Sequence, residues 1–158
     1  MFSGEIYMTF SPSRIKQLVD SLKKRKKKVV FTNGVFDILH YGHISYLIRA
    51  RRLGDVLIVG MNSDSSVRKF KPEGRPIQNE LDRAKILAAL RPVDYVVRFS
   101  EETPERLIRL IRPDILVKGA DYKLEDIVGA DFVRSYGGQV RRMKLMPGRS
   151  SSKIIKSI

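Results

Sequence analysis

Hydrophobic positions along the chain follow two spacings, which alternate from one segment to the next. After Ser11–Pro12, apolar residues recur every three or four positions through Leu22. This spacing predicts a helix that Ser11 caps with its side chain. A short apolar run over residues 28–32 follows and meets Asn33–Gly34. Such a run predicts a buried strand that ends at the asparagine-glycine pair.

The same two spacings continue to the end of the chain. The helix that follows the first strand is expected to turn Ile44, Leu47 and Ile48 inward. Further strands are predicted over residues 55–61, 94–98, 114–118 and 139–144. Helices are predicted over residues 42–53, 79–91 and 125–136, and from residues 63, 103 and 150 onward.

This order of elements predicts the fold class. Strands that alternate with helices form a parallel sheet that helices cover on both faces. We therefore expect a single Rossmann-like, doubly wound α/β domain over residues 1–158, with a five-stranded parallel sheet. Residues 28–158 would form its core, and residues 1–27 would form an N-terminal helical extension.

Composition narrows the class of protein. Of the 158 residues, 42% are hydrophobic, which is enough to bury a core. No apolar run reaches the roughly 20 residues that span a membrane, and Met1–Phe10 lacks the pattern of a signal peptide. The absence of cysteine excludes disulfides and cysteine-based zinc sites. We therefore expect a cytoplasmic protein that does not bind a membrane.

The formal net charge of +14 has two interpretations. It is typical of a protein that binds a phosphate-rich ligand such as nucleic acid, a nucleotide or an anionic lipid. It is equally typical of a solvated surface rich in lysine and arginine. The densest run, Lys23–Lys28, closes the first predicted helix, where cations suit the helix dipole. Because runs of like charge are usually solvated, we favour the second interpretation for this run.

The only two histidines of the chain, His40 and His43, stand three residues apart. They follow the first predicted strand and open the next helix, at the sheet edge where doubly wound folds bind ligands. Imidazoles there can donate hydrogen bonds to a phosphate, and Gly34 and Gly42 leave room for its approach. A zinc site is the rival use, but catalytic zinc usually takes three protein ligands and Asp37 is the one further candidate. We therefore favour phosphate binding.

Residues 32–43, T-N-G-V-F-D-I-L-H-Y-G-H, resemble the opening motif of the cytidylyltransferase-like nucleotidyltransferases, whose core is H-x-G-H. Further motifs of that superfamily recur in order: N-S-D-S-S-V at 62–67, G-R-P-I at 74–77 with Arg83, V-K-G-A-D-Y at 117–122, and G-R-S-S-S-K-I-I at 148–155. Together they most resemble the heptose 1-phosphate adenylyltransferases, which are often fused behind a ribokinase-like sugar kinase. The resemblance covers residues 29–158.

This resemblance implies transfer of AMP from ATP to D-glycero-D-manno-heptose 1-phosphate by direct in-line attack. The products would be pyrophosphate and ADP-heptose, a precursor for lipopolysaccharide or another heptose-bearing glycan. It also implies Mg²⁺ bound mainly through the ATP phosphates, and a homodimer. Two alternatives share the histidine motif: a cytidylyltransferase acting on glycerol 3-phosphate or a related alcohol phosphate, and an FMN adenylyltransferase. A nucleic-acid-binding module ranks lowest, because it gives no reason for the histidine pair.

The resemblance also implies a set of site residues and no metal held by the protein itself. As catalytic residues it implies His40 and His43 on the transferred phosphate, with Lys71 and Arg75 on the leaving pyrophosphate; Lys69 is a weaker candidate. The implied nucleotide-binding residues are Thr32, Asn33, Gly34, Phe36, Asp37, Gly42, Asn62, Asp64, Arg83, Lys118, Gly119, Asp121, Tyr122, Ser150, Ser151 and Ser152.

The chain departs from the family pattern in two ways. It contains no kinase segment, so we expect a stand-alone transferase. The last motif reads G-R-S-S-S at residues 148–152, where the family usually has Gly-Cys-Ser-Thr-Thr. Serine keeps the hydroxyl group of threonine. Arg149 either adds a phosphate contact or points to solvent, and the sequence leaves both open.

Overall fold

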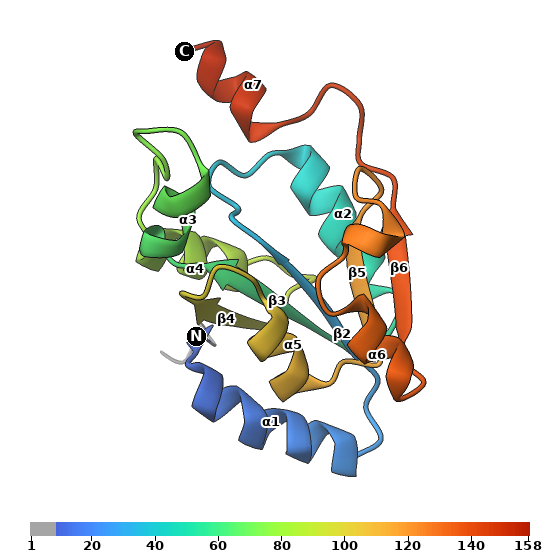
Figure 1. Cartoon of the computed structure of the whole chain (residues 1–158). Helices are drawn as coiled ribbons and strands as arrows, with labels where there is room; N and C mark the ends of the chain where they lie inside the picture. The colour runs from blue at the N-terminus through green and yellow to red at the C-terminus, as the bar shows by residue number, and fades with distance from the viewer. Residues whose placement is uncertain (1–8) are drawn as a thin grey trace.

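The structure, a computed structural model, describes residues 9–158, which contain a six-stranded sheet with only parallel pairings (Figure 1). The strands are β1 (Thr9–Phe10), β2 (Val29–Gly34), β3 (Val56–Asn62), β4 (Tyr95–Phe99), β5 (Ile115–Gly119) and β6 (Gln139–Met143). Their order is β1-β4-β3-β2-β5-β6. The five predicted strands are confirmed, and β2 to β6 have the 3-2-1-4-5 order of a doubly wound sheet. Strand β1, which spans only two residues, adds an edge that the sequence pattern did not reveal.

Helices cover both faces of the sheet (Figure 1). They are α1 (Pro12–Lys24), α2 (Tyr41–Arg51), α3 (Asp64–Phe70), α4 (Glu80–Ala88), α5 (Glu105–Ile111), α6 (Ala130–Ser135) and α7 (Ser151–Lys156), with a 3₁₀ turn η1 at Leu124–Asp126. One apolar core cluster unites α1, α5 and α6 with the sheet, and a second unites α2 and α4 with its other face. Successive β2 residues serve opposite clusters, Val29 and Phe31 the first and Val30 the second, as the two-residue period of a strand requires.

Helix α1, which the sequence analysis assigned to an extension, buries Ile15, Val19 and Leu22 in the first core cluster. Residues 1–8 of that expected extension, and most of the Met1–Phe10 segment, lie outside the described residues. The expected side-chain cap at Ser11 is wrong: Ser11 occupies the cap position, but its hydroxyl accepts no hydrogen bond from a backbone N–H of the helix and instead bonds the Ser13 hydroxyl at 3.1 Å. Within residues 9–158, no helix is both long and apolar enough to cross a membrane.

Three other local expectations are corrected by the structure. Strand β2 continues through Asn33–Gly34, because both residues pair in register with β3. Helix α2 buries Tyr46 and Ala50 beside Leu47, whereas Ile48 is exposed. The helix expected over 125–136 is split into η1 and α6, since Gly129 before α6 has a φ of +81° that is incompatible with a continuous helix.

Aspartates at the amino ends of the strands tie neighbouring strands together. The backbone N–H of Lys28 donates to Asp55, that of Val29 to Asp114, and that of Leu57 to Asp94, at 2.7, 2.7 and 2.8 Å. We call this region the amino edge of the sheet. These bonds satisfy backbone donors at the start of β2 and β3 and so help to fix the strand register.

Candidate functional site

A cavity of about 550 Å³ opens at the carboxyl ends of the central strands. Asn33 and Gly34 reach it from β2, Asn62 from β3, and Lys118 and Gly119 from β5. Strand β2 lies between β3 and β5. The sheet continues through β3 and β4 on one side of β2 and through β5 and β6 on the other, so the strand order changes direction at β2. This switch point is where doubly wound sheets bind ligands.

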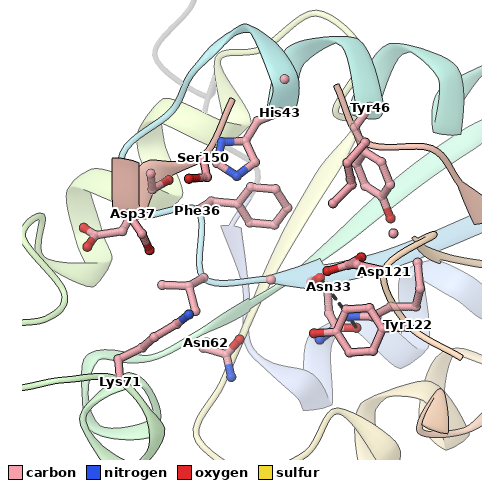
Figure 2. A pocket seen from close by; sticks show the side chains of 18 of the residues that line it. Asn33, Phe36, Asp37, His43, Tyr46, Asn62, Lys71, Asp121, Tyr122 and Ser150 are labelled. Atoms are coloured by element: carbon pink, nitrogen blue, oxygen red, sulfur yellow. Dashed lines mark hydrogen bonds between the residues drawn. The ribbon is translucent and has the colours of Figure 1, made fainter. Parts of the chain in front are cut away.

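The cavity brings together most of the predicted site residues from separate parts of the chain (Figure 2). Its lining includes Asn33, Gly34, Phe36, Asp37, His40, Gly42, His43, Asn62, Lys71, Arg75, Lys118, Gly119, Asp121, Tyr122, Ser150, Ser151 and Ser152. Figure 2 shows His43, Ser150 and Asp37 toward one end, which we call the histidine end. Asn33, Asp121 and Tyr122 lie toward the other, which we call the tyrosine end.

The two histidines form the centre of the histidine end. Their rings stack with centroids 3.9 Å apart and planes inclined by 25°, and the Phe36 ring lies 5.3 Å from that of His43. The Nδ1 atoms of His40 and His43 are buried and have no hydrogen-bond partner within residues 9–158. A buried polar atom without a partner is costly, so this pair indicates a site that a ligand completes.

Both imidazoles are uncharged at neutral pH. Burial, with a contribution from the neighbouring His40, lowers the pKa of His43 to about 4. Burial and the positive charge of Arg149 lower the pKa of His40. Two neutral rings can stack closely without charge repulsion, and each has one N–H to donate. The pair can therefore orient a phosphate but brings no positive charge to it.

Glycines make room for these rings as well as for a ligand. A Cβ atom on Gly42 would lie 2.9 Å from the His40 ring, and one on Gly34 would lie 2.9 Å from the Phe36 ring. Both distances are shorter than normal contact, so the aromatic rings keep their places only beside glycine.

Asp37 anchors the loop that follows α3. Its buried carboxylate accepts hydrogen bonds from Arg75 Nε at 2.7 Å and from the backbone N–H groups of Ile77 and Gln78 at 2.9 Å. Burial acts to raise the pKa of Asp37, but these hydrogen bonds outweigh it and hold the pKa below its usual value. Within residues 9–158, no group of three or more histidine, aspartate or glutamate side chains is placed to hold a metal ion.

Arg83 does not line the cavity but lies beneath it, only 1% exposed. Its guanidinium donates to the carbonyl oxygens of Gln78, Val35 and Asn62 at 3.0, 2.7 and 2.9 Å, and to Asp64 at 2.6 Å. One buried side chain therefore ties together three segments, around Val35, around Asn62 and Asp64, and at Gln78. Arg83 was predicted to contact the nucleotide, whereas four of its five N–H donors are engaged by the protein itself.

Two further predicted residues lie behind the cavity wall. Asp64 is engaged by Arg83, and its backbone N–H donates to Glu80 at 2.7 Å. Thr32 is fully buried, and its hydroxyl shares a hydrogen bond of 2.8 Å with Tyr46, which does line the cavity. Thr32 thus supports a lining residue, whereas Asp64 contacts Arg83 and Glu80, and neither Thr32 nor Asp64 lines the cavity.

Lys118 organises the tyrosine end. Its ammonium lies 3.3 Å from Asn33 Oδ1 and 4.5 Å from the centroid of the Tyr122 ring. Burial lowers the pKa of Lys118 to about 8, although the nearby Asp121 acts to raise it. The lysine is thus held in place by an amide and an aromatic face, with Tyr122 exposed beside it.

Some lining residues were missed by the sequence analysis. Residues 102–104 follow β4 directly, and their place after a strand could have identified them. Residues 126–128 were assigned to a helix, so nothing in the pattern indicated them. The missed lining residues are Val35, Tyr46, Phe70, Glu102, Thr103, Pro104, Asp126, Ile127, Val128, Leu145 and Met146. Arg149, for which the sequence left a phosphate contact and a solvent-facing side chain open, also lines the cavity.

Residues 31–157 match the family model described as cytidylyltransferase-like. Among curated relatives, the bifunctional protein HldE of Syntrophotalea carbinolica is 54% identical over 91% of this chain, and that of Campylobacter curvus is 55% identical over 90%. The chain covers 29% and 30% of these two relatives, so it spans about three tenths of their length.

Solved structures agree with this match. The lipopolysaccharide core biosynthesis protein from Thermoplasma volcanium superposes with a TM-score of 0.61 at 32% identity, over 75% of this chain and 98% of that one. Pantoate-beta-alanine ligase from Francisella tularensis has a TM-score of 0.63 at 17% identity, over 92% of this chain and 69% of that one. This second likeness establishes the fold alone.

Proposed function

This chain belongs to the cytidylyltransferase-like family, and we propose that it transfers AMP from ATP to D-glycero-D-manno-heptose 1-phosphate, producing ADP-heptose and pyrophosphate. The motifs at residues 32–43 and 148–155 support this pair of substrates through their resemblance to heptose 1-phosphate adenylyltransferases. The identity with the HldE proteins and the fold shared with a lipopolysaccharide core biosynthesis protein support the same assignment.

The stacked histidine pair is the observation that carries the proposal. In the reaction, an oxygen of the sugar phosphate bonds to the α-phosphorus of ATP while the bond from that phosphorus to the bridging oxygen breaks. Because the attacking oxygen is already an anion, no strong general base is needed. The enzyme's contribution is then alignment and stabilisation of the developing charge. Neutral His40 and His43 suit the first task, since each offers a fixed N–H at the switch point of the sheet.

The charge on the leaving pyrophosphate requires cations that the histidines do not provide. We assign this task to Lys71 and to Arg75, whose Nε is held by Asp37 while its Nη groups have no hydrogen bond to residues 9–158. The hydroxyls of Ser150 and Ser152 would add neutral donors. Mg²⁺, where bound, would be carried by the phosphates of ATP and by water, as its preference for oxygen ligands allows.

The tyrosine end would receive the nucleoside. Tyr122 offers an exposed ring for stacking, and Gly119 permits close approach of the ligand to β5. Lys118 and Asp121 would contact the ribose or the phosphates. A homodimer and a cytoplasmic location, which the resemblance also implies, complete the proposal.

A substrate panel tests this function. Purified protein is incubated with ATP or CTP, each combined with heptose 1-phosphate, glycerol 3-phosphate or FMN, and released pyrophosphate is measured. We expect ATP with heptose 1-phosphate to react fastest by a wide margin. Faster release from CTP with glycerol 3-phosphate, or from ATP with FMN, would replace the proposed activity by that alternative.

A further inference from the structure

Arg149 lies at the histidine end of the cavity, in the turn between β6 and α7. Its Cβ atom lies close to the first turn of α2: a Cβ atom on Gly42 would lie 3.2 Å from Arg149 Cβ and 2.9 Å from the His40 ring. The turn is held by a hydrogen bond from Arg149 N–H to the Met146 carbonyl at 3.4 Å. Ser151 next to it donates to the Ile38 carbonyl at 2.7 Å. These contacts fix the position of the Arg149 main chain and Cβ atom beside the histidine pair.

Among the residues that the structure describes, no carboxylate neutralises the positive charge of Arg149. Arg149 forms no ion pair within residues 9–158. Four carboxylates line the cavity, those of Asp37, Glu102, Asp121 and Asp126, and within residues 9–158 none of them pairs with Arg149. Asp37 is engaged by Arg75 and two backbone N–H groups, and Asp121 lies at the tyrosine end (Figure 2). The charge is nevertheless close enough to His40 to contribute to the lowering of its pKa.

The histidine end therefore combines two neutral rings with one unpaired guanidinium. We propose that Arg149 binds the β- and γ-phosphates of ATP and the pyrophosphate formed from them, as a catalytic residue of the transfer. A guanidinium fits such a ligand because its planar donors can pair with two phosphate oxygens at once. When the α-phosphorus bond to the bridging oxygen breaks, the electron pair stays on the pyrophosphate, and Arg149 stabilises that growing charge.

This inference rests on the proposed function, but it makes a separate claim about which part of the substrates Arg149 contacts. ADP-heptose and heptose 1-phosphate lack the pyrophosphate leaving group. Loss of the arginine charge should therefore weaken the binding of ATP and pyrophosphate and leave the binding of the two sugar ligands unchanged.

The test compares Arg149→Met with Arg149→Lys, and with Arg141→Met as the matched control. Arg141 is also exposed and lies on β6, and within residues 9–158 its side chain bonds only Gln139 of its own strand. Steady-state rates in both directions give KM values for ATP, pyrophosphate, heptose 1-phosphate and ADP-heptose. We expect Arg149→Met to raise the KM of ATP and of pyrophosphate by about 10- to 100-fold, the usual effect of losing a charged hydrogen bond. Arg149→Lys should recover part of this loss, and Arg141→Met should change nothing.

Two further readouts separate the possible failures. Calorimetric titration with inorganic pyrophosphate measures binding without turnover, and equal affinity in wild type and Arg149→Met would overturn the inference even if ADP-heptose is formed. Conversely, pyrophosphate binding that depends on Arg149 in a protein that makes no ADP-heptose would reject the proposed function alone.

The second readout is the NMR titration of His40. In Arg149→Met this titration should move to higher pH, because the neighbouring positive charge is gone. An unchanged titration would place the guanidinium away from the histidines and contradict the inference.

Discussion

The amino edge of the sheet and its opposite, carboxyl edge differ in whether every buried polar side chain of the described residues has a hydrogen-bond partner. At the amino edge, Asp55, Asp94 and Asp114 accept hydrogen bonds from backbone N–H groups, and Arg51 pairs with Asp94 at 2.7 Å. At the carboxyl edge, the Nδ1 atoms of His40 and His43 are the only buried side-chain nitrogen or oxygen atoms without a partner in the described part of the chain.

This difference suggests that the amino edge contributes mainly to stability, whereas the carboxyl edge is where we expect a ligand to bind. Polar groups that are bonded to one another at the amino edge help to hold the strands in place. Unbonded groups at the carboxyl edge cost stability, since burial removes water without providing a replacement. A fold retains such groups where a ligand satisfies them. Variants at the two edges should therefore affect different measurements.

The largest effect is expected from His43→Ala at the carboxyl edge. Loss of a fixed donor to a transition-state charge typically costs about 10²- to 10³-fold in kcat, and the melting temperature should change little, because the removed ring has no hydrogen bond on Nδ1 to lose. Turnover with ATP and heptose 1-phosphate and thermal unfolding of the same sample provide the measurement. A variant with normal turnover would show that His43 does not contact the reacting phosphate.

The next effect is expected at the amino edge. Asp114→Ala leaves the Val29 N–H without an acceptor beneath a fully buried side chain, and we expect the free energy of unfolding to fall by about 1–3 kcal/mol. Denaturant titration measures this change, while kcat of the folded protein should stay near wild type. Asp114→Asn, which keeps an acceptor oxygen, is the control and should lose less. A sharp fall in kcat of folded Asp114→Ala, with little change in the free energy of unfolding, would contradict the distinction between the two edges.

A smaller effect links the histidine pair to pH. The pKa of His43 is about 4 in the folded protein and about 6.5 for an unperturbed histidine, so the unfolded chain takes up its proton first. Stability should therefore be intact above about pH 6.5 and decline as the pH falls toward 4. Denaturant titrations across this range should show a shallower decline in His43→Gln than in wild type. Identical slopes would mean that His43 is not buried in its neutral form.

The smallest effect is expected from the lysine run beyond the amino edge, where Lys23–Lys28 is exposed throughout. The double variant Lys24→Gln and Lys27→Gln should change the free energy of unfolding by less than about 0.5 kcal/mol and leave the KM of ATP unchanged. Fluorescence titration with a labelled oligonucleotide at moderate salt tests the nucleic-acid alternative on the same proteins. Saturable binding that the double variant loses would give this run a function that the structure does not otherwise indicate.

The sequence identified the histidine end because its residues are close together along the chain. His40 and His43 share one helix start, and Ser150 caps α7 through a hydrogen bond from Lys153 N–H, as the sequence pattern predicted. Lys118 and Gly119 at the end of β5 were likewise found from one motif. Residues 126–128 were missed, since the helix break at Gly129 depends on a backbone angle that no apolar spacing reports.

The linear pattern alone was enough to predict a parallel α/β sheet and the edge at which the residues that line its cavity collect. Apolar periodicity and strand-helix alternation are local properties, and they can be read over a few residues at a time. Folding decided which charged groups remain available to a ligand. Arg83 is engaged by Val35, 48 positions away, and Asp37 by Arg75, 38 positions away, whereas Arg149 has no ion-pair partner in residues 9–158. Ion pairing and burial depend on approach in space, and for residues this far apart that approach exists only once the sheet has brought its loops together.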